Sequence, residues 1–437
     1  MALQKLFDRF NYIKNHHGFQ MYFHNTKWLF IAQFYRFIVG FLVGVWVARY
    51  FGPTKLGIFS YVLAFTSIFA GIAKLGLDGI VVRDLVNEPE KKDIYLGTAF
   101  RLKIIGALLV LGLIAIAVQF TSNSAVTNLY IFIIASGLIF QSFEVIDFYF
   151  QSKVLSKFVS ISQMAQIFLS SLLKIYFILV RAGLIWFVIV SSFDQVALAV
   201  SLLFAYRYQK LPKFFKYFDL ETAKKLLKNS WPYILSTISI SIYMGIDKVM
   251  IKSMIGNREL GLYSAGIKFA TVWYFVPMLI TNSLFPAIIN AKNLSVKLYN
   301  DRLSRLYTLM MWMSIGIALS VTFLGHQIIT FFYGIKYIGA AGVLEIYIWT
   351  NVFVFLGVAS GKYLLAENYV KILLYTTFAG MISNVILNII LIPKYGIYGA
   401  AVAALISYFI STFFIGLIHK TSKQAVLMLK AIIPRGL

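Results

Sequence analysis

Twelve long apolar segments follow one another along the chain, with polar residues gathered in the short stretches between them. Each segment is about 20 residues long, the length at which an α-helix crosses the hydrocarbon core of a membrane. The apolar residues run continuously instead of alternating with polar ones, which favours membrane helices over barrel strands. The predicted spans are 28–49, 56–77, 101–120, 128–150, 158–180, 184–206, 231–254, 261–290, 306–325, 340–364, 369–392 and 397–419.

A decapeptide that follows the first span returns after the seventh. Phe51–Ser60 (FGPTKLGIFS) and Ile255–Ser264 (IGNRELGLYS) share two glycines, a leucine and the final serine in one register, 204 positions apart. This period is too long for a solenoid. It is typical of a membrane protein built from two homologous halves, and such halves move against each other in transporters. The repeat therefore makes transport the first hypothesis.

The span pattern and the repeat together predict five segments. Two six-helix lobes are expected to be joined by the longest polar link, in which Asp219 is placed to cap a short helix, 220–229, packed on the bilayer surface. This link is interpreted as an anchor between the lobes, with a specific lipid-headgroup site as the alternative. The segments are 1–27 (interfacial), 28–206 (N-lobe), 207–230 (cytoplasmic amphipathic linker), 231–420 (C-lobe) and 421–437 (cytoplasmic tail).

Composition and charge agree with a membrane location. The chain is 60% hydrophobic and only 13% charged, whereas soluble domains are about half apolar and a quarter charged. Of the 40 Lys and Arg residues, 28 flank the spans on one side and six on the other, which predicts that both termini are cytoplasmic. Because the net charge of +24 is spread over many membrane-flanking pieces, it indicates topology and not a nucleic-acid partner.

Several functional classes lack their residues. The chain contains no cysteine, which excludes disulfides and thiolate metal sites, and it has no phosphate-binding loop of the ATPase type. We therefore expect no metal, no cofactor and no catalytic residues. Energy coupling, where transport needs it, is expected to come from a proton or sodium gradient.

Apart from the cations counted with the flanking stretches, six lie inside predicted spans, where each costs roughly 2.5–3.5 kcal/mol if it faces lipid at mid-depth. Five of the six fall on spans 1, 2, 7 and 8, which the repeat relates in pairs. We interpret these five as the lining of a cationic cavity that binds an anionic substrate, with ordinary ion pairing or snorkelling as the alternative. The sixth cation is Lys174; the five candidates are Arg36, Lys74, Lys248, Lys252 and Lys268.

Acidic residues and prolines within spans supply candidates for coupling and bending. Asp247, next to Lys248, is the first candidate for a proton- or sodium-coupled switch, with charge balance as the alternative, and Asp194 is the second. Glu144 is a third candidate, although neutralising Lys153 or Lys157 is the preferred interpretation. Two further residues, Pro277 and Pro286, remove backbone hydrogen bonds in span 8 and are hinge candidates.

Three stretches together resemble polysaccharide-biosynthesis flippases of the Wzx type. Ala48–Gly57 (ARYFGPTKLG), followed by Lys74–Asp78 (KLGLD) and Arg83, is similar to their N-terminal signature. The start of their second half is matched by Ser230-Trp231-Pro232, Asp247–Met250, Gly256, Gly261–Ala265 and Lys268. Their penultimate hairpin is matched by Asn384–Asn388, Ile392-Pro393, Gly396 and Gly399–Ala401. The resemblance covers nearly the whole chain.

The resemblance implies the fold of the multidrug/oligosaccharidyl-lipid/polysaccharide (MOP) exporters, with two lobes around a central cavity and alternating access. It implies a substrate of undecaprenyl-pyrophosphate-linked repeat units, for O-antigen, capsule or exopolysaccharide, moved across the bacterial inner membrane. Membrane lipids, and a polysaccharide polymerase with chain-length proteins, are the partners that it implies. In relatives of this kind, helices 1, 2, 7 and 8 line a cationic cavity, which agrees with the distribution of cations described above.

Three other functions are weighed against this one. A proton- or sodium-coupled drug exporter of the same fold is disfavoured, because a cationic cavity repels the cationic compounds that such exporters often carry. A lipid II or teichoic-type flippase is the second alternative, although lipid II flippases of this fold usually carry two extra helices. A glycosyltransferase or polymerase is the third, but the chain has no D-x-D motif and no long outer loop.

Overall fold

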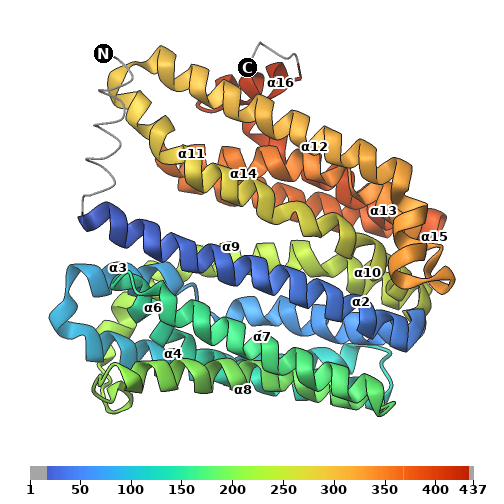
Figure 1. The fold of residues 1–437 in the computed structure, drawn as a ribbon, viewed down its shortest axis with the longest axis horizontal. Coiled ribbons are helices and arrows are strands. Elements are labelled where there is room, and N and C mark those ends of the chain that lie inside the picture. Colours follow the sequence, from blue (N-terminus) through green and yellow to red (C-terminus); the bar gives the residue numbers. More distant parts are fainter. Residues whose placement is uncertain (1–16, 368, 433–437) are drawn as a thin grey trace. The chain divides into compact units, whose positions relative to one another are not determined.

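The computed structural model describes residues 17–367 and 369–432, and every regular element in these ranges is a helix (Figure 1). Ten of the described helices are long and apolar enough to cross a membrane. Two of these are hairpins, because Asn25–Asn87 breaks at Gly52 and Lys371–Leu417 breaks at Gly396. Counting each hairpin as two gives twelve crossings in the described ranges. The predicted all-α membrane fold with about twelve spans is therefore confirmed.

Backbone contacts divide the chain into two compact units. The N-terminal unit comprises the chain up to Val47 and Phe69–Thr237, and the C-terminal unit comprises Ala48–Ile68 and Ile238–Leu437. Two helices are shared: α2 (His17–Ala73) gives its middle part to the C-terminal unit, and α9 (Leu220–Ile255) gives its first half to the N-terminal unit. Both copies of the repeat consequently belong to the C-terminal unit.

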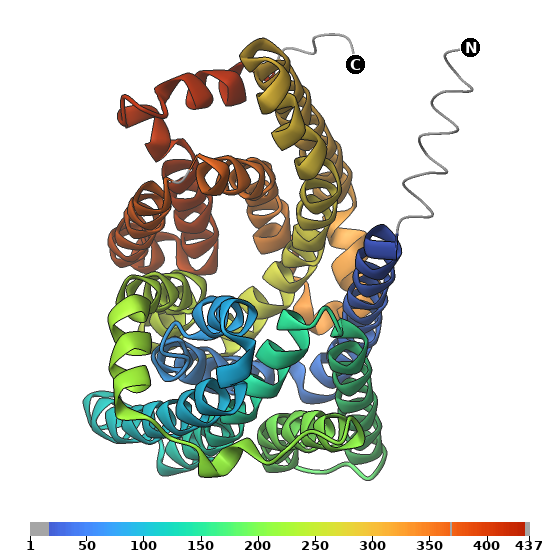
Figure 2. The same ribbon diagram turned by 90° about the vertical axis from the view of Figure 1, so that its left-hand side faces the viewer.

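The N-terminal unit is a bundle in which α7 and α8 run side by side, and Figure 2 views many of its helices end-on. Its buried core includes Leu77, Leu96, Phe150 and Phe214, all fully inaccessible to solvent. Besides the shared helices, it contains α3 (Asp78–Asn87), α4 (Lys92–Ala117), α5 (Ala125–Ser136), α6 (Val145–Ser152), α7 (Ser156–Leu179) and α8 (Leu184–Tyr208).

The C-terminal unit has a core of its own, centred on Tyr307, Met310, Phe355 and Leu356. The predicted span 8 is interrupted in the middle by a 3₁₀ turn at Val272–Tyr274. The helices of this unit are α10 (Asn257–Thr271), α11 (Phe275–Leu294), α12 (Val296–Tyr333), α13 (Ala340–Tyr347), α14 (Thr350–Ala366), α15 (Val370–Phe413) and α16 (Ser422–Lys430).

The two copies of the repeat have the same local conformation. Gly52 (φ 70°) and Gly256 (φ 103°), which are 204 positions apart, both lie in the left-handed region and end the preceding helix. A side chain is disfavoured there, whereas glycine adopts this conformation readily. The repeat seen in the sequence is therefore a repeat of structure, with a helix break at the same position in each copy.

The two copies also pack directly against each other. A Cβ atom placed on Gly57 would lie 1.7 Å from the carbonyl oxygen of Asn257, and one placed on Gly261 would lie 1.8 Å from that of Pro53. These four residues form two pairs separated by the repeat period, so the contact is reciprocal. Only glycine permits backbones to approach this closely, which explains why both copies carry it.

The polar link before α9 is partly as predicted and partly different. The carboxylate of Asp219 accepts hydrogen bonds from the Thr222 amide at 2.7 Å and its hydroxyl at 2.6 Å, which confirms the predicted cap. These bonds lower the pKa of Asp219. The predicted short helix 220–229, however, does not end before span 7: α9 runs unbroken from Leu220 through Pro232 to Ile255.

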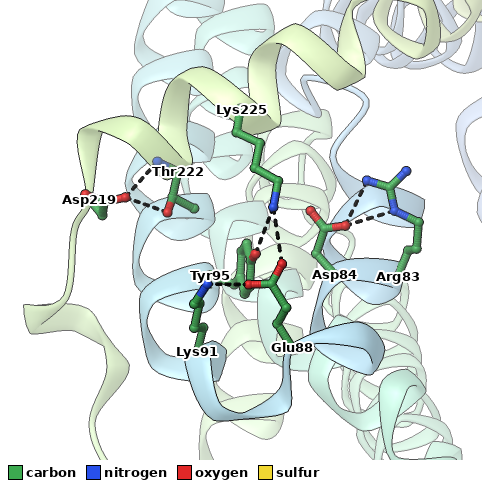
Figure 3. A network of polar contacts seen from close by, with 8 residues as sticks. All are labelled: Arg83, Asp84, Glu88, Lys91, Tyr95, Asp219, Thr222 and Lys225. Carbon is green, nitrogen blue, oxygen red and sulfur yellow. Dashed lines mark hydrogen bonds and ion pairs between the residues drawn. The ribbon is translucent and has the colours of Figure 1, made fainter.

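The first turns of α9 pack on the N-terminal unit, and their placement on the bilayer surface stays a prediction. Ala223 and Leu226 are buried in its core. Figure 3 shows Lys225 reaching the Glu88 carboxylate at 3.4 Å and the Tyr95 hydroxyl at 3.3 Å. Hydrogen bonding, first from Lys91 and then from Lys225, lowers the pKa of Glu88 to about 2. Glu88 is thus an anion at neutral pH, and it ties the start of α9 to the α3–α4 connection.

Candidate functional site

A cavity of about 570 Å³ lies within the C-terminal unit, among the repeat helices, α9, α13 and α15. We call it the charged cavity, because the charged side chains among its described lining residues are Lys248, Lys268 and one carboxylate, Asp247. Two cations and one anion give this cavity a net positive charge, although the helices around it are long and apolar enough to cross a membrane. Such groups are costly in hydrocarbon and mark pathways for polar substrates.

One wall of the charged cavity is built by the repeat itself. Four pairs of lining residues are related by the period of 204: Ser60 with Ser264, Leu63 with Ile267, Ala64 with Lys268, and Ser67 with Thr271. Three of the pairs match in chemical character. The fourth does not, because Ala64 faces the cavity at the position equivalent to Lys268. The wall is therefore two-fold in form but carries its positive charge on one side only.

Asp247, on α9, is buried in the lining of this cavity, with 5% of its surface exposed. One of its carboxylate oxygens accepts a hydrogen bond from the Tyr263 hydroxyl at 2.5 Å, and the other accepts the Lys248 amide at 2.8 Å. The two oxygens are thus held by partners from α9 and α10. These bonds fix the orientation of the carboxylate in the cavity that Lys248 also lines.

Aromatic hydroxyls surround the charges. Tyr243, Tyr274, Tyr347 and Tyr408 line the cavity, and the Tyr243 and Tyr408 rings pack edge to face with centroids 4.9 Å apart. Among the described residues, the buried hydroxyls of Tyr243 and Ser264 have no hydrogen-bond partner. An unsatisfied buried hydroxyl costs about 1–3 kcal/mol, so a ligand that supplies hydrogen-bond partners is favoured here.

The Asp247–Tyr263 bond gives a testable prediction about stability. Replacing Tyr263 with Phe is expected to lower the free energy of unfolding by about 1.5–3 kcal/mol, because a hydrogen bond to a charged group is lost. Tyr337→Phe is the matched control, since the Tyr337 hydroxyl donates to the neutral Ala48 carbonyl at 2.6 Å and its loss should cost about 0.5–1.5 kcal/mol. Thermal unfolding of the detergent-purified variants measures both. If the two variants lose the same free energy of unfolding, Tyr263 does not donate to an ionised carboxylate.

The five cations predicted to bind substrate are not all brought together here. Lys248 and Lys268 line the charged cavity, but Lys252, one turn further along α9, does not, and its ammonium lies 4.7 Å from the centroid of the Tyr61 ring. Arg36 and Lys74 belong to the N-terminal unit, the former exposed on α2 and the latter in the turn that follows it. The substrate-binding roles of Arg36, Lys74 and Lys252 stay predictions.

The other predicted acids have partners within the N-terminal unit. Asp194 pairs at 3.3 Å with Lys174, the sixth intramembrane cation. Glu144 pairs at 2.8 Å with the buried Lys103, so the predicted partners Lys153 and Lys157 are wrong. Lys103 lies 41 residues away in sequence, and local spacing gave no indication of it. The roles of these acids in coupling stay predictions.

The hinge candidates lie in α11, directly after the interruption of span 8. Pro277 is the third residue of this helix, where a missing backbone N–H costs little. Its carbonyl accepts the Thr281 hydroxyl at 2.7 Å. Pro286 is also in α11, but its side chain is outside the described residues. Hinge motion stays a prediction for both.

The tyrosines and Asn384 were missed as site residues by the sequence analysis. A usable signal was present: tyrosine is enriched at membrane interfaces, yet Tyr408 and Tyr274 fall near the middle of their predicted spans. Tyrosines in the middle of a predicted span therefore indicate a polar site within the protein, as charged residues at the same depth do. Which of them share a cavity depends on tertiary packing.

A helical membrane bundle with an internal polar cavity is typical of membrane transporters. Comparison with known proteins gives the family of this chain. The sequence model of the family described as polysaccharide biosynthesis protein matches residues 23–292, more than half of the chain. The chain belongs to this family. A second model, MatE, matches residues 232–390.

Two relatives extend the likeness over most of the chain. The probable low-salt glycan biosynthesis flippase Agl15 of Haloferax volcanii is 24% identical, covering 88% of this chain and 80% of its own. The capsular polysaccharide biosynthesis protein CapF of Staphylococcus aureus is 23% identical, covering 89% of this chain and 96% of its own.

Solved structures show the same fold. The inward closed conformation of the lipid II flippase MurJ superposes with a TM-score of 0.71 at 18% identity, covering 92% of this chain and 90% of MurJ. The inward-facing conformation of a multidrug resistance MATE family transporter of the MOP superfamily gives 0.68 at 14% identity, covering 91% and 96%. The chain therefore has the MOP fold.

Proposed function

We propose that this protein is a flippase that moves polyprenyl-pyrophosphate-linked oligosaccharide repeat units from the cytoplasmic to the outer leaflet of the plasma membrane by alternating access. The charged cavity is the observation that carries the proposal. A pyrophosphate needs cations, and Lys248 and Lys268 supply them within a membrane-spanning unit. The family membership and the names of the relatives, which concern glycan and capsule synthesis, support the same class of substrate.

The finer details are part of the same proposal. The lipid is undecaprenyl pyrophosphate in a bacterial inner membrane, both chain termini are cytoplasmic, and Arg36 also binds the pyrophosphate during transport. The glycan serves O-antigen, capsule or exopolysaccharide. A polymerase and chain-length proteins act on it after transfer. Asp247 balances the cations and changes partners during the cycle, with a proton or sodium gradient as the coupling source.

Deleting the gene in its host tests this function. We expect surface polysaccharide to be lost and single lipid-linked repeat units to accumulate on the cytoplasmic face, both restored by the wild-type gene. The surface polymer and the polyprenyl-linked pool are analysed together, which also identifies the glycan. Normal polymer without an accumulated intermediate would overturn the proposal.

A small-molecule exporter of the same fold is the second candidate. The MatE match at residues 232–390 and the fold shared with a multidrug transporter favour it. The two lysines of the charged cavity argue against cationic drugs, because like charges repel at close range in a medium of low dielectric constant. Drug-resistance profiling of the deletion strain discriminates: increased sensitivity with normal polymer would favour this candidate.

A further inference from the structure

A second cavity, of about 290 Å³, lies within the C-terminal unit beside the charged one. We call it the neutral cavity, because none of the described residues that line it is charged. Tyr243, Tyr274 and Tyr408 line both cavities and thus form a shared wall between them.

The wall of the neutral cavity is rich in hydroxyl groups. Eight of its eighteen lining residues are Ser, Thr or Tyr, and most of the others are apolar or aromatic. Thr376 and Thr377 donate hydrogen bonds to the Leu373 carbonyl at 2.8 and 2.9 Å, and Thr412 donates to the Phe353 carbonyl at 3.0 Å. A hydroxyl that donates to a carbonyl keeps its oxygen as an acceptor. The wall therefore presents acceptors next to apolar surface.

This chemistry selects among the parts of a lipid-linked glycan. The pyrophosphate would find no cation among the described residues that line the neutral cavity, and a polyprenyl tail could not supply the hydrogen-bond partner that the buried Tyr243 hydroxyl lacks among the described residues. A neutral sugar fits both features, because its hydroxyls donate to the wall while its C–H faces pack on tyrosine rings. The volume lies at the lower end of small-molecule sites, about 300–1,000 Å³. It suits one sugar better than a chain of several.

We propose that the neutral cavity binds a neutral monosaccharide of the repeat unit, the one attached to the pyrophosphate, while the charged cavity holds the pyrophosphate. The adjacency of the cavities matches the covalent adjacency of the two groups. Tyr243, Tyr274 and Tyr408 then position the sugar against the phosphates. This assignment rests on the proposed function and adds a specificity site to it.

Filling the neutral cavity tests the assignment in the host. A Cβ atom on Gly361, which lines the cavity, meets no atom within 4 Å, so Gly361→Leu introduces a side chain without a backbone clash. The matched control is Gly316→Leu on α12, where a Cβ atom also meets nothing and the residue is exposed. At equal protein levels, we expect G361L to reduce surface polymer at least 10-fold and G316L to leave it unchanged. Wild-type polymer with G361L would overturn the assignment.

Cysteine protection separates this inference from the proposed function. The chain has no cysteine, so Ser411→Cys reports on the neutral cavity and Ser264→Cys on the charged one without background labelling. The purified variants are treated with a maleimide in the presence of undecaprenyl pyrophosphate, or of the glycan-bearing lipid extracted from the deletion strain. We expect both lipids to slow labelling of S264C, and only the glycan-bearing lipid to slow labelling of S411C.

Each remaining outcome has one meaning. If undecaprenyl pyrophosphate, which carries no sugar, protects S411C, then lipid or phosphate occupies the neutral cavity and the assignment is overturned. Protection of S264C by the glycan-bearing lipid without protection of S411C would overturn it as well, while leaving the proposed function standing. Failure of both lipids to protect either cysteine would contradict the proposed function itself.

Discussion

Replacing Lys248 with alanine is expected to abolish surface polysaccharide at unchanged protein level. Lys248 lines the charged cavity beside the buried Asp247, and its loss leaves that carboxylate balanced by Lys268 alone. A hydrogen bond to a charged group is worth about 1.5–3 kcal/mol, so we expect the apparent affinity for the lipid-linked glycan to fall about 10- to 100-fold. Surface polymer in a complemented deletion strain, and binding to the purified protein, measure the effect.

Lys252→Ala is the matched control for this prediction. It removes the same group from the same helix, one turn away, at a residue that does not line the cavity. We expect it to keep most of the polymer, and Lys248→Arg to keep some, because the positive charge is retained. Equal loss in K248A and K252A would show that the charged cavity is not where the substrate binds.

The repeat offers a stricter version of the same test. Ala64 occupies the position equivalent to Lys268 on the opposite half of the cavity wall. We expect Lys268→Ala to reduce transport as strongly as K248A, and the double variant A64K/K268A to recover part of it, because the charge returns to the same cavity. Absence of any recovery would mean that the position of the charge, and not only its presence, is required.

The second large effect is expected at the contact between the two copies of the repeat. Gly261→Ala would place a methyl group 1.8 Å from the Pro53 carbonyl oxygen, and Gly57→Ala would place one 1.7 Å from that of Asn257. Both obstacles are backbone atoms, so the helices must separate. We expect a loss of stability at or above the upper end of the range of about 1–3 kcal/mol for overpacking. The yield and thermal unfolding of the purified variants measure it.

Gly316→Ala provides the control for the glycine prediction. Its added methyl group meets no atom within 4 Å, and alanine favours a helix over glycine by about 1 kcal/mol. G316A should therefore be as stable as the wild type or slightly more so. If G261A unfolds at the same temperature as G316A, the close approach of the two copies does not exist in the membrane.

The sequence was sufficient to predict the spans because a membrane helix is defined by its own length and hydropathy. The helix breaks at Gly52 and Gly256 and the Asp219 cap were also readable, since each depends on a few neighbouring residues. What failed were statements about partners. The ion pair between Glu144 and Lys103 joins two consecutive spans, but which side chains meet between them is decided by how the helices pack.

The candidate site was predictable to the same limited extent. Lys248, Lys268 and Asp247 could be found from the high cost of charges within spans, and the structure places them in one cavity. Lys252 satisfied the same criterion but faces Tyr61 instead, because side-chain direction decides which surface a residue lines. The shared tyrosine wall joins α9, the 3₁₀ turn at Val272–Tyr274 and α15, and no single stretch of sequence contains it.

Transfer of the glycan between leaflets is the most direct measurement of the central claim. The glycan-bearing lipid that accumulates in the deletion strain is placed in liposomes with the purified protein, and a membrane-impermeant lectin or periodate reports how much glycan has changed sides. We predict that wild-type protein equilibrates the glycan between leaflets, while K248A liposomes behave like liposomes without protein. Equal rates with wild-type protein, with K248A and without protein would contradict the account.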